Sequence, residues 1–161
     1  MRLTGPGSFA ALLVLAAPLS AHQKPPKAAE AGALSISAPA AAATVDAFHA
    51  ALRRGDTKAA AALLADDALI FESGAAERSK AEYAAHHLPA DAEFSRAVSS
   101  VVTRRAGSSD GGIAWIASEG RTTGTYKGKR LDLSTTETMV LRRAGSAWKI
   151  THVHWSSAAT R

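Results

Sequence analysis

The chain has 161 residues and a formal net charge of +5, and it contains no cysteine. The lack of cysteine excludes disulfides, thiolate catalysis and thiolate metal ligands. The basic residues are scattered near expected turns with few aromatic residues between them, which does not fit a nucleic-acid-binding surface, so we expect no nucleic-acid partner.

Residues 1–21 have the layout of a secretory signal peptide: Arg2, a short apolar run, and a small-residue cleavage site at Ser20-Ala21. The run is too short to remain as a membrane-spanning helix, so we expect a protein exported to the periplasm or the medium, without a membrane anchor after cleavage. Residues 22–42 are rich in Ala and Pro and predict a flexible linker. Residues 43–157 suffice for one compact domain, followed by a short tail at 158–161.

Helical patterns open the domain. Val45, Phe48 and Leu52 recur at helical spacing, and Gly55 stands where that helix is expected to end. Asp56 is the expected N-cap of a second, short helix over residues 57–64.

A strand over residues 68–72 is predicted next. Ser79 and Glu82 then form a capping box, which indicates the start of a third helix. This helix is expected to end at residues 86–88, because Pro89 disfavours a helical conformation in the residue before it.

The hydrophobic period then changes to two, which predicts four long strands joined by turn-rich segments. These strands are residues 94–105, 113–126, 130–143 and 148–156. Helices first and an antiparallel meander afterwards predict an α+β domain, with the helices on one face of a curved sheet.

Two sequence segments resemble those of a known family: Asp-Asp-Ala-Leu-Ile-Phe at residues 66–71 and Trp-Lys-Ile-Thr-His-Val-His at residues 148–154. With the helix–helix–strand–helix opening, they resemble the NTF2-like superfamily, and more narrowly its SnoaL-like and DUF4440-type domains. The His-x-His ending resembles the association domain of calmodulin-dependent kinase II. The resemblance covers residues 43–157.

That resemblance implies an NTF2-like cone of three N-terminal helices packed on a strongly curved antiparallel sheet. It further implies a pocket between sheet and helices, and commonly a homodimer packed through the sheet. The superfamily includes isomerases, cyclases, dehydratases, ligand-binding domains and assembly domains, so the resemblance assigns no catalytic residue.

Strand register suggests a polar patch on the inner face. A three-residue turn centred on Gly128 would place Glu119 opposite Glu137 and Arg121 opposite Thr135. The last hairpin, turning at Ala144-Gly145, would place Glu137 opposite His152 and Thr135 opposite His154. The last strand would then present Trp148, Ile150, His152 and His154 on one face.

In this interpretation Glu137 and His152 form a catalytic dyad that moves a proton on a small, partly apolar ligand. Arg121 would hold an anionic group. The other ligand-binding candidates are Glu119, His154, Glu72, Tyr83 and His87. No organic or redox cofactor is expected, since the chain has no dinucleotide fingerprint or phosphate loop.

Other interpretations stay open. The same Glu and His residues equally suit a structural network that sets strand register, in a non-catalytic dimerisation domain. His152 and His154, joined by one of His86 and His87, would suit a metal ion. Trp155, on the face opposite His154, is expected to be an exposed anchor of a sheet-mediated dimer.

Overall fold

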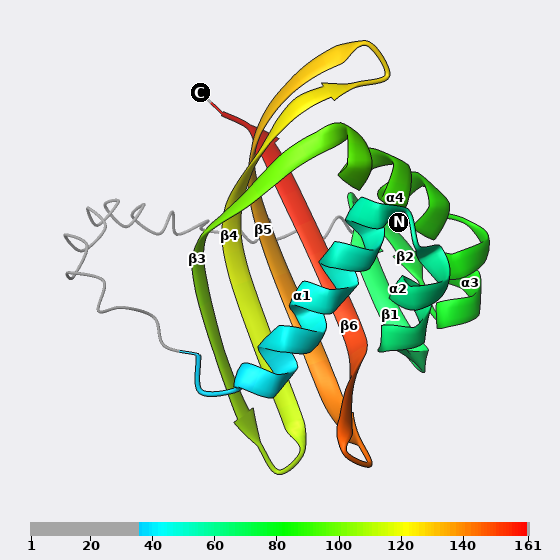
Figure 1. Cartoon of the computed structure of the whole chain (residues 1–161), viewed down its shortest axis with the longest axis vertical. Coiled ribbons are helices and arrows are strands. Elements are labelled where there is room, and N and C mark those ends of the chain that lie inside the picture. Colours follow the sequence, from blue (N-terminus) through cyan, green and yellow to red (C-terminus); the bar gives the residue numbers. More distant parts are fainter. Residues whose placement is uncertain (1–35, 161) are drawn as a thin grey trace, which may run out of the picture. The chain divides into compact units, whose positions relative to one another are not determined.

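The computed structural model describes residues 36–160; the predicted signal peptide and most of the predicted linker lie outside them. Four helices and six strands follow one another along these residues (Figure 1). They are α1 (Pro39–Arg54), α2 (Thr57–Leu63), β1 (Leu64–Glu72), β2 (Ala75–Glu77), α3 (Lys80–Ala85), α4 (Leu88–Ala97), β3 (Val98–Asp110), β4 (Ile113–Tyr126), β5 (Lys129–Ala144) and β6 (Ala147–Ala159).

The first two helices begin and end as local chemistry dictates. Gly55 ends α1 in the left-handed conformation, with φ of 73°. The Asp56 side chain caps α2 by accepting a hydrogen bond from the backbone N–H of Ala59. Helix α1 starts at Pro39, and Ala41 is fully buried, so the folded domain begins inside the segment predicted as a linker.

Pro89 starts a helix instead of following one. The capping box at Ser79 opens α3 as predicted, with the Ser79 hydroxyl accepting from the N–H of Glu82. After a break at residues 86–87, α4 begins at Leu88 with Pro89 in its first turn, where a missing N–H costs nothing. Phe94, predicted to begin a strand, therefore lies in a helix.

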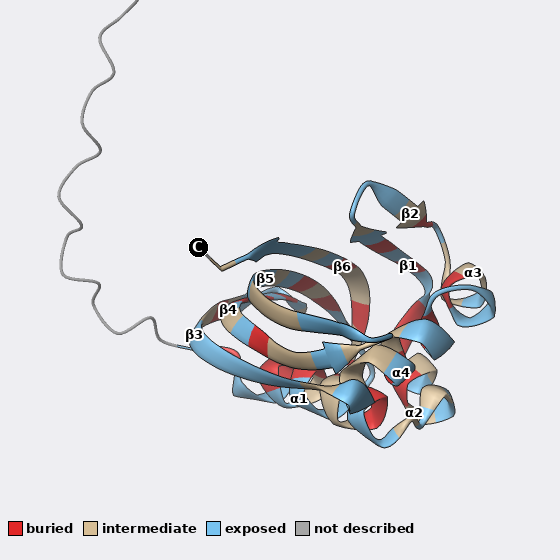
Figure 2. Ribbon diagram, turned by 90° about the horizontal axis from the view of Figure 1, so that it is seen from above, coloured by how far each residue is buried: buried red, intermediate tan, exposed pale blue. Residues whose placement is uncertain are grey.

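The six strands form one sheet in the order β2-β1-β6-β5-β4-β3. All neighbours are antiparallel except β1 and β6, which run parallel. Helix α1 crosses the inner face of the curved sheet, with α2 and α4 on the same side (Figures 1 and 2). The predicted α+β class and curved sheet are confirmed, with one more helix and one more strand than expected, and one parallel strand pair.

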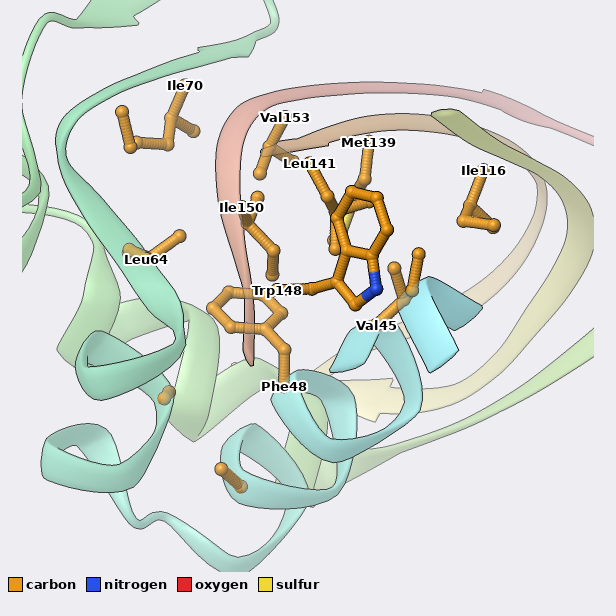
Figure 3. Close-up of a cluster of buried hydrophobic side chains, with 14 of the residues drawn as sticks. Val45, Phe48, Leu64, Ile70, Ile116, Met139, Leu141, Trp148, Ile150 and Val153 are labelled. Carbon is orange, nitrogen blue, oxygen red and sulfur yellow. The ribbon is translucent and has the colours of Figure 1, made fainter. Parts of the chain in front are cut away.

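The hydrophobic core fills the space between α1 and the sheet (Figure 3). Phe48 and Val45 of α1 are fully buried against the inner residues of β4, β5 and β6. Those strand residues are Ile116, Met139, Leu141, Trp148, Ile150 and Val153. This packing fixes which side of each strand faces the helices, because a shift by one residue would expose the whole set.

The predicted register between the second and third strands of the meander is wrong. The β4–β5 turn has two residues, Lys127 and Gly128, both with positive φ, and not three. Two positive φ values are typical of the type I′ hairpin turn. Glu137 therefore lies opposite Ser118, and Glu119 lies opposite Thr136.

The predicted register of the last hairpin is also wrong. Leu141 pairs with Ile150, but Val140 pairs with His152, so one residue of β6 is inserted as a bulge. The bulge reverses the faces of the rest of the strand. The turn residues are Gly145 and Ser146, one position later than predicted, which shifts the pairing by two residues, and the bulge adds a third. Glu137 consequently lies opposite Trp155 and not opposite His152.

Candidate active site

A cavity of about 260 Å³ lies between the helices and the open end of the sheet. Its walls come from α1, α4, the end of β1, and strands β3 to β6. Apolar side chains make part of the wall, and five acidic residues also line it. Asp46 and Glu119 are exposed, whereas the other three, Glu72, Asp91 and Glu137, are partly buried. A small, mostly apolar cavity with a few polar groups is the usual form of a small-molecule site.

Glu137 is held as a carboxylate by two donors. Its Oε2 lies 2.7 Å from His49 Nε2 of α1 and accepts a 2.8 Å hydrogen bond from the Trp155 indole N–H. Burial alone would raise the pKa of Glu137. The hydrogen bonds from His49 and Trp155 and the positive charge of Arg105 outweigh that effect, so its pKa lies below the ordinary value.

Stacking orders Trp155, and an ion pair and a hydrogen bond anchor Arg105, whose positive charge acts on Glu137. The Trp155 ring stacks on Phe48, with ring centroids 6.3 Å apart. Arg105 of β3 reaches across to α1, where its Nη1 donates to Asp46 at 2.6 Å, and its Nε donates to Ser118 at 3.1 Å. Two of the contacts in this wall, those from His49 and Trp155, reach Glu137 Oε2 itself and orient the carboxylate.

The second acidic group, Asp91, has its pKa shifted in the opposite direction. The hydroxyl of Tyr83, a fully buried residue, donates a 2.6 Å hydrogen bond to Asp91 Oδ2. Burial raises the pKa of Asp91 above its ordinary value, against the opposing effects of Tyr83 and His87. Burial and the neighbouring Asp91 charge likewise raise the pKa of Glu72. Asp91 and Glu72 thus retain a proton more readily than free carboxylic acids.

One cavity therefore contains carboxyl groups whose pKa values are displaced in opposite directions. Glu137 is stabilised as an anion, a form that can accept a proton. Asp91 is shifted toward the neutral acid, a form that can donate one. Such a separation of two similar groups by their environments is what general acid–base catalysis requires.

The structure brings together only part of the predicted site. Glu137 and Glu72 line the cavity, and Glu119 lies at its edge with a side chain that is 56% exposed and 3.7 Å from Arg104. Arg121 points outward and makes a two-armed ion pair with Asp132, at 2.7 and 2.5 Å.

The two histidines of β6 lie apart from Glu137. The bulge places His152 and His154 on the outer face of the sheet, where both rings contact Phe71 edge-on. His152 Nδ1 is 3.1 Å from the carbonyl oxygen of Leu69. The predicted Glu137–His152 dyad is therefore not formed.

The remaining candidates lie in α3 and in the break between α3 and α4. Tyr83 is buried and bonded to Asp91, and His87 contacts Glu77 through its Nδ1. Trp155, predicted to be an exposed dimer anchor, instead packs between Phe48 and the cavity.

Sequence reasoning missed two residues of the site, His49 and Asp91. His49 follows Val45 by four residues and thus lies at the border of the apolar stripe of α1, a position that faces a cavity as easily as solvent. Asp91 gave no signal because Pro89 indicates the end of a helix when read alone, which leaves residues 90–93 without a predicted place.

Within residues 36–160, no three His, Cys, Asp or Glu side chains are grouped so that they could hold a metal ion. His152 and His154 have ring centroids 6.4 Å apart, and the aromatic ring that both contact is Phe71. No helix in this part of the chain is long and apolar enough to cross a membrane.

Comparison with known proteins identifies the family of the chain. A crystal structure of a proposed ketosteroid isomerase from Shewanella frigidimarina is 42% identical, covers 73% of this chain and 94% of its own, and has a TM-score of 0.70. A proposed calcium/calmodulin-dependent protein kinase II association domain from Xanthomonas campestris is 23% identical over 80% of this chain and 95% of its own, with a TM-score of 0.62.

A proposed dehydratase of the NTF2-like family from Streptomyces avermitilis is 19% identical over 76% of this chain and 96% of its own, with a TM-score of 0.62. The last two likenesses concern the fold alone. No curated protein sequence gives a significant match. The model of the SnoaL-like domain matches residues 41–160, so the chain belongs to the SnoaL-like family of the NTF2-like superfamily.

Proposed function

We propose that this domain binds a small, partly apolar organic ligand in the main cavity and transfers a proton on it. The observation that carries the proposal is that one cavity contains Glu137, whose pKa is lowered, and Asp91, whose pKa is raised. Phe94, Val101 and Leu133 supply apolar wall for the body of the ligand. The 42% identity to a proposed ketosteroid isomerase is consistent with this chemistry.

The arrangement suits a carbonyl compound with an acidic C–H bond. Glu137 would accept the proton from carbon, and the electron pair of that C–H bond would move toward the carbonyl oxygen. Asp91, supported by the Tyr83 hydroxyl, would donate a hydrogen bond or a proton to that oxygen as its negative charge develops. Return of the proton to a different carbon completes an isomerisation. In a dehydration, Asp91 instead gives its proton to a departing β-hydroxyl group, which leaves as water.

A β,γ-unsaturated cyclic ketone is a direct probe, since its isomerisation produces a conjugated ketone with a new ultraviolet absorption. We expect Glu137→Gln and Asp91→Asn to lose turnover while Glu119→Gln retains it. Glu119→Gln is the matched control because it removes one carboxylate from the rim without touching the buried groups. Turnover that survives Glu137→Gln contradicts the proposed base.

Native mass spectrometry tests binding independently of turnover. The protein purified from its own host is expected to carry a non-covalent organic mass, which Trp155→Ala should remove, because Trp155 forms part of the cavity wall. An empty protein that also fails to bind any member of an enolisable ketone panel would favour a structural role for the Glu137 network.

The family's sheet-packed homodimer is a second element of the proposal. The outer face of the sheet exposes several large hydrophobic side chains, of which Trp115 is 44% and Ile113 49% exposed. Phe71 and Leu69, both 39% exposed, extend this surface beyond His152 and His154. An exposed apolar sheet face of this kind is typical of a protein–protein contact. We also propose export, on the basis of the predicted signal peptide.

A further inference from the structure

A second cavity, of about 140 Å³, lies beneath the β1–β2 hairpin. Glu72 and Ser73 line both this cavity and the main one, so the two spaces share a wall. Glu77, Tyr83 and His87 complete the polar lining of the second cavity. We propose that His87 and Glu77 form the solvent end of a proton route that leads through this second cavity to Glu72 and Asp91.

The outer end of the route is the contact between His87 and Glu77, which joins the protein surface to the interior. Glu77 is one of the few buried polar residues, and its side chain is 6% exposed. His87 Nδ1 contacts Glu77 Oε1, whereas half of the His87 side chain is exposed to solvent. A histidine can take up a proton from water and release it near neutral pH, and its two ring nitrogens allow it to do so on opposite sides.

The inner end of the route reaches the proposed acid. Tyr83 lines the second cavity and donates its hydroxyl hydrogen to Asp91, which lines the main one. Glu72 lines both cavities. The groups facing the second cavity thus come from four parts of the chain: Glu72 from β1, Glu77 from β2, Tyr83 from α3, and His87 at the start of α4. A cavity of this size and polarity has room for water molecules that would connect them.

The chemistry of a dehydration creates a need for such a route. Asp91 gives its proton to the departing hydroxyl, the C–O bond breaks, and water leaves. Glu137 takes the proton from carbon and releases it to water once the product has left. Asp91 must regain a proton from solvent before the next turnover, and a route through the second cavity supplies it even while the product fills the main cavity. An internal isomerisation has no such need, because the proton on oxygen returns to Asp91. The route therefore rests on the proposed function and points to its dehydratase form.

Exchange of the Tyr83 hydroxyl proton with solvent, followed by nuclear magnetic resonance, measures the route without any ligand. Glu77→Gln keeps the size of the side chain but cannot accept a proton, and His87→Gln replaces the half-exposed partner. We expect either variant to slow the exchange by about tenfold or more. His86→Gln is the matched control, since His86 is the exposed neighbour of His87 and lines neither cavity. Added imidazole should restore exchange in His87→Ala.

Unchanged exchange in both variants would overturn the route. Faster exchange would also overturn it, by identifying the His87–Glu77 pair as a seal against water. Failure of the proposed function is distinguishable: a domain that turns over no carbonyl compound can still show slowed exchange in Glu77→Gln. Conversely, loss of turnover in Asp91→Asn combined with normal exchange in both Glu77→Gln and His87→Gln would leave the acid in place and remove the route.

Discussion

Replacement of Glu137 by Gln tests the centre of the site through protein stability alone. The substitution preserves the shape of the side chain and removes its negative charge. The amide oxygen of the new side chain can still accept a hydrogen bond from the Trp155 indole, but His49 loses its charged partner. The substitution therefore removes one charge-assisted hydrogen bond, between His49 and a Glu137 side chain that is only 10% exposed.

A hydrogen bond to a charged group contributes about 1.5–3 kcal/mol. Part of this is offset, because a buried neutral amide is less costly to desolvate than a buried carboxylate. We expect the variant to be about 1–2 kcal/mol less stable at pH 7, corresponding to a fall in Tm of roughly 4–8 °C for a domain of this size. Glu119→Gln, at an exposed ion pair, should change stability by less than about 0.5 kcal/mol.

The pH dependence of urea denaturation gives the sharper test. The pKa of Glu137 in the folded protein lies below its ordinary value of 4.5. Its stabilising effect is therefore complete above about pH 4.5 and is lost as the pH falls through the lower, folded value. The difference between wild type and Glu137→Gln should shrink over that acidic range. A difference that is absent at pH 7, or that persists unchanged into acid, would refute the reasoning.

Three further predictions concern other parts of the domain. Asp91→Asn should gain stability relative to wild type as the pH rises above 3.8, because the raised pKa of Asp91 makes its ionisation unfavourable to folding; urea denaturation at several pH values measures this. Gly120→Ala should destabilise by about 1–3 kcal/mol, since a Cβ there would lie 2.8 Å from the carbonyl oxygen of Val101; a melting curve indistinguishable from wild type would contradict it. Trp115→Glu should convert the proposed dimer to a monomer in light scattering, whereas Trp115→Phe should leave its mass unchanged.

Local signals in the sequence were sufficient for three of the four helices. Gly55, Asp56 and Ser79 each end or cap a helix as predicted, since every one of these contacts spans only a few residues. The fold class followed from the order of helical and alternating patterns. Pro89 failed as a signal because proline is compatible with the first turn of a helix as well as with the end of one.

The site depended on register, where a shift by one residue moves a side chain to the other face. At the β4–β5 turn, Lys127 adopts a positive φ that is uncommon outside glycine, so the turn is shorter than its residues suggested. In β6 the apolar positions change phase after Ile150, continuing at Val153 and Trp155. That change of phase is visible in the sequence and marks the bulge. The prediction instead kept a strict alternation through His152 and His154, and so placed both histidines on the inner face of the sheet.

The place of β6 in the sheet has a consequence for folding. Strands β3, β4 and β5 are joined by short hairpins and can pair as soon as each is synthesised. Strand β1 precedes them in the chain. Its neighbours in the sheet are β2 and β6, and β6 follows all the other strands in the chain. Contacts between segments so distant in sequence form slowly, and unpaired strand edges favour aggregation. The wall that contains Trp155 thus closes only when β6 joins the two parts of the sheet, so shortened chains ending before residue 147 should not form the main cavity.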